Sequence, residues 1–144
     1  MSKLFIYQVT FLINMKYLKA FMAGVALPVI ICPFIFMWLA YSGNINVLEH
    51  IPMYFIPMIW GLWNVLLIAI GKNCIIKNVN MRQWVHGGLL GLLIALVGLY
   101  IFKIDMALFG ISLPQAYWML LVAPITYGFV WRYVVLPLNK MVKV

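Results

Sequence analysis

Residues 84–102, WVHGGLLGLLIALVGLYIF, decide the fold class, because this run is long, apolar and free of Asp, Glu, Lys and Arg. At about 1.5 Å per residue a helix of this length crosses the roughly 30 Å of hydrocarbon in a bilayer. Three further spanning runs occur at residues 20–41, 51–71 and 113–136, and the only charge within them is Arg132, near the end of the last. The sequence therefore predicts an all-α membrane protein: a four-helix transmembrane bundle, one domain over residues 1–144.

The overall composition agrees with this fold class. The chain is 67% hydrophobic and only 8% charged, and its mean hydropathy is +1.10. A soluble domain normally carries about a quarter of its residues as charged side chains. The net charge of +8 would suggest nucleic acid only if the bases formed a patch on a polar fold. Here they lie singly at the edges of apolar runs, so we expect a lipid bilayer and no nucleic acid as partner.

The distribution of lysine and arginine predicts the orientation, because cytoplasmic segments of membrane proteins retain positive charge. Lys103 and both acids, Glu49 and Asp105, fall in the two connections predicted on one side of the membrane. All other bases fall on the opposite side, at Lys3, Lys16, Lys19, Lys72, Lys77, Arg82, Arg132, Lys140 and Lys143. We therefore expect both termini in the cytoplasm. The small, nearly loop-free chain lacks an N-x-[ST] glycosylation site, which favours a bacterial inner membrane.

The first residues have three interpretations. Residues 4–14 are apolar but too short to span, and Lys16 and Lys19 separate them from the first span, which favours an interfacial helix. Alternatively, translation starts at Met15. A third interpretation is a cleaved signal peptide, since Ala40 and Ser42 place small residues at the spacing of a cleavage site.

The third span carries small residues at steps of about four: Gly87, Gly91, Ala95 and, nearby, Gly98. Such a row lets another backbone approach closely and predicts a helix-packing seam. The partner helix is either in the same chain or in another protomer.

A weak internal echo links the second and fourth spans. Pro57, Trp60 and Gly61 have the same spacing as Pro124, Tyr127 and Gly128. The echo is either chance or the trace of two tandem hairpins of the same orientation.

Asn64 is the most prominent polar residue within a span. An amide in hydrocarbon requires a hydrogen-bond partner, and the simplest one is a neighbouring helix. Thr126 and Tyr127 of the fourth span lie at a matching depth. The alternative is contact with a substrate or a lipid headgroup.

Residues at the inner membrane surface are candidate headgroup contacts. These are Arg82, Trp84, His86 and Arg132, because bases and amphipathic rings favour the interface. His50 and His86 are expected on opposite faces of the membrane, which excludes a shared metal ion or haem within one chain. Cys32 and Cys74 are also separated, so we expect no disulfide, no metal site and no cofactor.

No catalytic motif is present: no G-x-S-x-G, no H-E-x-x-H, no phosphate-binding glycine loop and no acid within a span. We therefore predict a non-catalytic accessory, assembly or scaffolding subunit whose partner is another membrane protein or a second copy. The alternative is a homo-oligomeric transporter or channel for a small solute or ion. It is motivated by Asn64 and by prolines in or beside the spans, at Pro28, Pro33, Pro52, Pro57, Pro114 and Pro124. A third hypothesis is a lipid-modifying enzyme that uses Arg82, Trp84 and His86.

Overall fold

The computed structural model describes residues 3–43, 54–70, 75–101 and 116–144. Within these ranges the chain is helical and has no strand. The order is α1 (Lys3–Tyr41), α2 (Ile56–Ile70), α3 (Val79–Leu96), the π-helical turn η3 (Val97–Ile101), α5 (Met119–Val130), the π-helical turn η5 (Trp131–Val135) and α6 (Leu136–Met141). Three helices are long and apolar enough to cross a membrane: Met15–Tyr41, Val79–Ile101 and Met119–Met141. The prediction of an all-α, multi-pass membrane protein therefore agrees with the structure.

The fourth predicted span is not confirmed. α2 has 15 residues, about 22 Å at about 1.5 Å per residue, which is shorter than the hydrocarbon layer. Pro57 explains the late start, because a proline is accommodated in the first helical turn and disfavours helix in the residues before it. Tyr54 and Phe55 form a short 3₁₀ turn instead. Hydropathy alone, which set the predicted start at residue 51, does not register this restriction.

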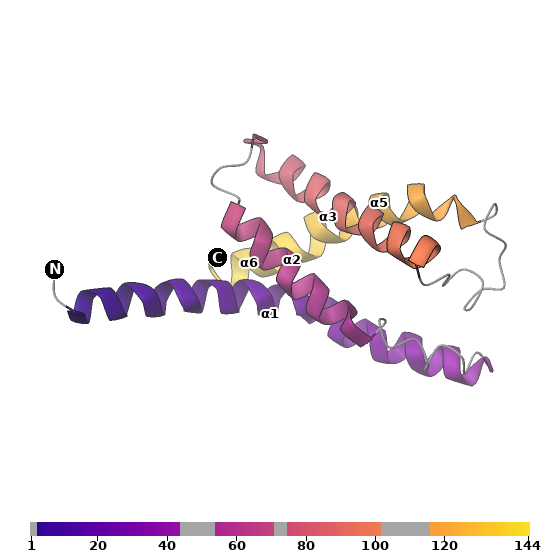
Figure 1. Cartoon of the computed structure of the whole chain (residues 1–144), viewed down its shortest axis with the longest axis horizontal. Coiled ribbons are helices and arrows are strands. Elements are labelled where there is room, and N and C mark those ends of the chain that lie inside the picture. The colour runs from indigo at the N-terminus through magenta and orange to yellow at the C-terminus, as the bar shows by residue number, and fades with distance from the viewer. Residues whose placement is uncertain (1–2, 44–53, 71–74, 102–115) are drawn as a thin grey trace.

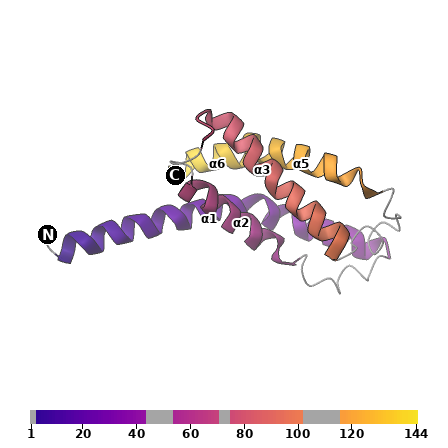
Figure 2. The same cartoon turned by 45° about the horizontal axis from the view of Figure 1, so that its top comes forward.

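α1 differs from the prediction of a separate N-terminal helix. It runs through Lys16 and Lys19 without interruption for 39 residues, which is roughly 58 Å at about 1.5 Å per residue. Figures 1 and 2 show its N-terminal part extending away from the other helices. Lysine interrupts the hydrophobic pattern but is a good helix former, so the backbone continues where the apolar run ends.

α3 begins five residues before the predicted span, at Val79, because Asn78 caps it. The Asn78 side-chain oxygen accepts hydrogen bonds from the backbone N–H groups of Asn80 (3.0 Å) and Met81 (3.3 Å). Such a cap satisfies donors that the first helical turn leaves unpaired. Part of the predicted cytoplasmic loop is therefore helical.

The last span continues past Pro137, where the sequence predicted its end. Pro137 lies in the first turn of α6, directly after the π-helical turn η5. A proline within a helix lacks an N–H and crowds the carbonyl four residues earlier. A π-helical turn is wider, which accommodates this defect without ending the helix. The helix consequently extends to Met141.

α1 and α2 form an antiparallel hairpin that crosses at two glycines. A Cβ added at Gly24 would lie 2.8 Å from the carbonyl oxygen of Trp60. A Cβ added at Gly61 would lie 2.5 Å from the ring of Phe21. Neither position has room for a side chain, so the two backbones approach each other closely at this crossing.

α3 and α5 form a second antiparallel hairpin with the same crossing, and the two helices cross in Figures 1 and 2. A Cβ added at Gly87 would lie 2.5 Å from the carbonyl oxygen of Tyr127, and one at Gly128 would lie 2.5 Å from the ring of Trp84. Phe21 lies three positions before Gly24 and covers Gly61, and Trp84 lies three positions before Gly87 and covers Gly128. The repeated Pro–aromatic–Gly spacing therefore marks an equivalent crossing in both hairpins.

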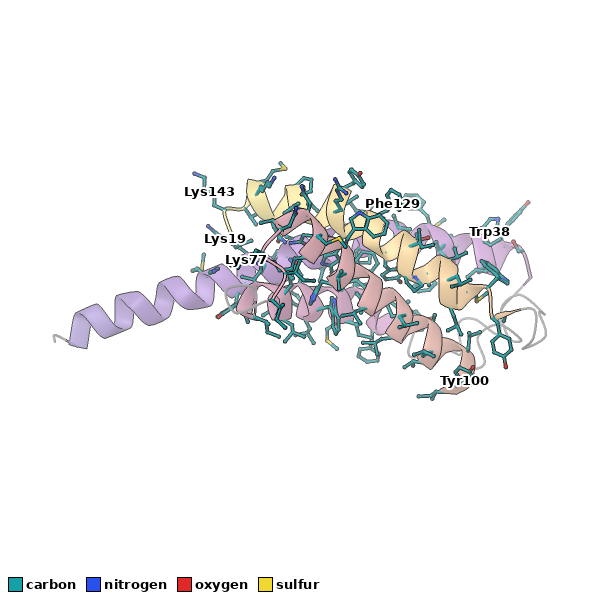
Figure 3. The ribbon with its side chains drawn as sticks, turned by 90° about the horizontal axis from the view of Figure 1, so that it is seen from above. Lys19, Trp38, Lys77, Tyr100, Phe129 and Lys143 are labelled. Carbon is teal, nitrogen blue, oxygen red and sulfur yellow. The ribbon has the colours of Figure 1, made fainter. Side chains whose placement is uncertain are left out.

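The two ends of the bundle differ in character. Lys19, Lys77 and Lys143, from three separate segments, lie at one end, and Trp38 and Tyr100 lie at the other (Figure 3). We call the first the basic end. The buried core between the ends consists of Trp60, Leu67, Leu90, Trp131 and Val135.

Candidate functional site

A pair of buried asparagines forms a closed polar contact toward the basic end of the bundle, where Ala20 follows Lys19 and Asn139 precedes Lys140. Asn64 of α2 is 0% exposed and Asn139 of α6 is 2% exposed. The Asn64 amide donates to the Asn139 side-chain oxygen at 2.8 Å, and the Asn139 amide donates back at 3.0 Å. Asn64 also donates to the backbone carbonyl of Ala20 at 2.6 Å. One amide pair thus joins α1, α2 and α6.

The predicted neighbours of Asn64 lie elsewhere. Its hydrogen bonds go to Asn139 and Ala20, whereas Thr126 is exposed and borders a cavity between α3 and α5. Tyr127 packs against Trp60, with ring centroids 5.0 Å apart. Asn139 was missed because the predicted span ended before Pro137. The apolar residues Leu136, Leu138 and Met141 around it were the available signal that the helix continues, although Lys140 follows it directly.

A second polar contact joins α2 to α3. The Trp63 indole N–H donates to the backbone carbonyl of His86 at 3.0 Å. The His86 Nε2 lies 3.0 Å from the backbone carbonyl of Trp63, and because a carbonyl only accepts, this nitrogen carries the proton. The two rings also stack, with centroids 4.8 Å apart. This reciprocal clamp fixes the His86 ring against α2.

Aromatic rings fill the space between the two hairpins. Trp60 lies against both Tyr127 and Trp131, with centroids 5.0 Å apart in each case. Trp131 is 0% exposed, and its ring lies 6.4 Å from that of His86. The centre of the bundle is therefore packed with side chains.

The predicted small-residue seam divides into two parts. Gly87 and Gly91 lie against the α5 backbone, where an added Cβ at Gly91 would be 2.6 Å from the carbonyl oxygen of Ala123. Their partner helix is thus in the same chain. Ala95 and Gly98 instead border an apolar cavity of about 390 Å³ between α3, η3 and α5.

The predicted headgroup residues are only partly brought together. Arg82 and His86 line one small crevice between α2 and α3. Trp84 lies on the other side of α3, where its ring covers Gly128 and meets the edge of Phe129 at 4.7 Å. The guanidinium of Arg132 lies over the ring of Tyr133, 5.2 Å from its centroid. These residues do not form one site.

The described residues contain no group of three or more His, Cys, Asp or Glu side chains able to hold a metal ion. Cys32 is a half-buried free thiol in α1. His50, Cys74, Glu49 and Asp105 lie outside the described residues, as do Pro52 and Pro114.

The comparisons with known proteins identify no family for this helical arrangement. No family model, curated protein or solved structure matches the chain. The function must therefore be inferred from the contacts within the bundle.

Proposed function

We propose that this chain is a non-catalytic integral membrane component: an accessory, assembly or scaffolding subunit of a membrane complex. The closed amide pair of Asn64 and Asn139 is the observation that supports this most. The amides of Asn64 and Asn139 bond to each other and to α1. An amide used in this way contributes to helix association rather than to solute binding.

The aromatic packing supports the same proposal. The space between the hairpins is filled by Trp60, Tyr127 and Trp131, with ring centroids 5.0 Å apart. A transport pathway through one chain would need an opening in this space. A rigid bundle of this kind suits a part that holds another protein in place.

The membrane placement is part of the proposal. The grouping of Lys19, Lys77 and Lys143 at one end supports an orientation with this end, and both termini, in the cytoplasm. We assign the chain to a bacterial inner membrane, with another membrane protein or a second copy as its partner.

The test is the mass of the intact complex after extraction of the tagged full-length chain from its native membrane in a mild detergent. We expect a second polypeptide in fixed stoichiometry. A monomeric chain with a turnover of its own would refute the proposal, and a pure homo-oligomer would favour the alternative below.

The alternative is a homo-oligomeric transporter or channel. The apolar cavity of about 390 Å³ beside Thr126 favours it, because it offers space between helices within the span. Flux into liposomes that contain the purified chain is the test. Solute or ion flux that depends on Thr126 would support a pathway here, and the absence of flux under any gradient would exclude it.

A further inference from the structure

The hairpin of α3 and α5 is closed at one point and open beyond it. At Gly91 an added Cβ would lie 2.6 Å from the carbonyl oxygen of Ala123, so the two backbones approach closely there. One turn further along α3, Ala95 and Gly98 border the apolar cavity of about 390 Å³ instead. Cavities that bind small molecules have volumes of about 300 to 1,000 Å³. The wedge between the two helices is therefore large enough for a ligand.

The walls of this cavity belong to well-packed parts of the bundle. Leu99 is 2% exposed, and Tyr127 is held against Trp60, with ring centroids 5.0 Å apart. α3 and α5 cannot move together to fill the wedge, because the contact of Gly91 with Ala123 already limits their approach. The cavity is thus formed before a ligand binds, which lowers the entropic cost of binding.

The cavity opens sideways toward the bilayer. Trp118 and Val122 border it and are 50% and 46% exposed, and the two helices that enclose it are long and apolar enough to span a membrane. Leu99, on the opposite wall, directly precedes Tyr100, which lies at the end away from the basic end (Figure 3). A ligand therefore enters from the hydrocarbon of the leaflet at the Tyr100 end, and it must itself be lipophilic.

Thr126 adds a hydroxyl group to these apolar walls. In the part of the chain that the structure describes, this hydroxyl has no hydrogen-bond partner. A threonine hydroxyl has one proton to donate, and leaving it unpaired in hydrocarbon costs free energy. An acceptor oxygen on the ligand would complete this bond.

We propose that this cavity binds one lipophilic small molecule that has a flat, rigid ring system and a carbonyl oxygen. The rings lie between α3 and α5 and pack against Trp118, and the carbonyl oxygen accepts a hydrogen bond from Thr126. This inference goes beyond the proposed accessory role and does not depend on it.

The shape of the cavity favours a ring system over the acyl chain of a lipid. An engineered apolar cavity of about 150 Å³ accommodates benzene, so about 390 Å³ has room for fused rings. A rigid ring system loses little conformational freedom on entering this space, whereas an acyl chain must fix several torsions. The half-exposed ring of Trp118 also gains a partner, because aromatic rings attract each other beyond the area they bury.

The experiment compares two probes with the same body. One is a naphthoquinone with methyl groups at both positions between its carbonyls, which blocks addition of a cysteine thiol. The other is the naphthalene with the same methyl groups and no oxygen. Binding to the full-length chain in a neutral detergent is measured by equilibrium dialysis, with empty micelles as background. For the wild type we expect one saturable quinone site, and weaker binding of the naphthalene.

Thr126→Val keeps the shape of the side chain and removes the hydroxyl. We expect it to weaken quinone binding about fivefold, the typical effect of losing one hydrogen bond, and to leave naphthalene binding unchanged. The quinone should then bind about as tightly as the naphthalene.

Val122→Trp tests the cavity itself, because it fills the wedge and should abolish saturable binding of both probes. Its matched control is Val29→Trp on α1, where the valine is 54% exposed and lies outside the cavity. This control should bind both probes as the wild type does. The pair keeps the test decisive if Thr126→Val fails to fold.

Three results would overturn the proposal. Unchanged quinone binding in Thr126→Val would remove the hydroxyl from the site. Equal binding in Val122→Trp and Val29→Trp would show that the probes bind elsewhere or only partition into the micelle. Displacement of the quinone by equimolar phosphatidylcholine would show that a lipid acyl chain occupies the cavity.

Discussion

The amide pair predicts a strong non-additivity between Asn64→Leu and Asn139→Leu. Leucine has the same number and branching of side-chain heavy atoms as asparagine but no polar group, so each substitution mainly removes hydrogen bonds. Asn64 makes bonds of 2.6 and 2.8 Å and accepts one of 3.0 Å. Either single variant leaves the other amide buried, since Asn64 and Asn139 are 0% and 2% exposed.

The magnitude follows from two contributions. A hydrogen bond between membrane helices contributes about 0.6 kcal/mol on average, and an amide left buried without a partner costs about 1 to 3 kcal/mol. Asn64→Leu removes three hydrogen bonds and leaves Asn139 unpaired, so we expect it to lower the free energy of unfolding by about 3 kcal/mol or more. Asn139→Leu leaves Asn64 bonded to Ala20, so we expect a loss of about 2 kcal/mol. The double variant loses the same three bonds but leaves no unpaired amide, so it should lose only about 2 kcal/mol, and the single losses should not add.

The assay is reversible unfolding of the four proteins in mixed micelles, with rising denaturing detergent and indole fluorescence as the signal. Thr126→Val is the control, because Thr126 is exposed and its loss should change the free energy of unfolding little. A double variant that loses the sum of the two single losses would show that the amides act independently. That result would refute the pairing of Asn64 with Asn139.

Three further predictions address packing, the clamp and the topology. Gly87→Val should lower the free energy of unfolding by about 2 kcal/mol or more, because its Cβ would lie 2.5 Å from a backbone oxygen. The control Gly88→Ala places its Cβ 3.4 Å from the nearest backbone oxygen and should be tolerated. Equal effects in a thermal unfolding assay would contradict the crossing. Trp63→Phe replaces the indole with a smaller phenyl ring and removes a donor bonded at 3.0 Å, so the free energy of unfolding should fall by about 1 kcal/mol or more. An unchanged free energy of unfolding would show that the clamp is unimportant. Single cysteines at Lys143 and Tyr100 should react with an impermeant thiol reagent from opposite sides of the membrane, because these residues lie at opposite ends of the bundle (Figure 3). Labelling of both cysteines from the same side would contradict a spanning arrangement.

Hydropathy predicted the fold class and the approximate positions of the long helices, because burial in lipid depends on composition over a whole segment. Helix ends depend on single residues instead. Asn78 starts α3 by capping it, Pro57 delays α2, and η5 carries the last helix through Pro137. The length of the apolar run contains none of this information.

The candidate site shows the same division. Asn64 was identified from its type and depth alone, because an amide in hydrocarbon requires a partner. Its partner was not predictable, since Asn139 lies 75 residues away in a segment assigned to the tail. The glycine row of α3 was readable from spacing, whereas the closing of Gly87 on α5 depends on how the hairpin folds back. The sequence grouped Arg82 and His86 with Trp84, but the turn of the helix places Trp84 on the other side of α3.

The distance between the two paired asparagines has a consequence for biogenesis. The ribosome adds roughly 5 to 20 residues per second, so the 75 residues between Asn64 and Asn139 take roughly 4 to 15 s to synthesise. During this interval the first hairpin sits in the bilayer with one amide lacking its final partner. The bonds between Asn64 and Asn139 therefore form only after α6 has been synthesised. A chain truncated before Asn139 would leave the Asn64 amide with its bond to Ala20 but without its two bonds to Asn139.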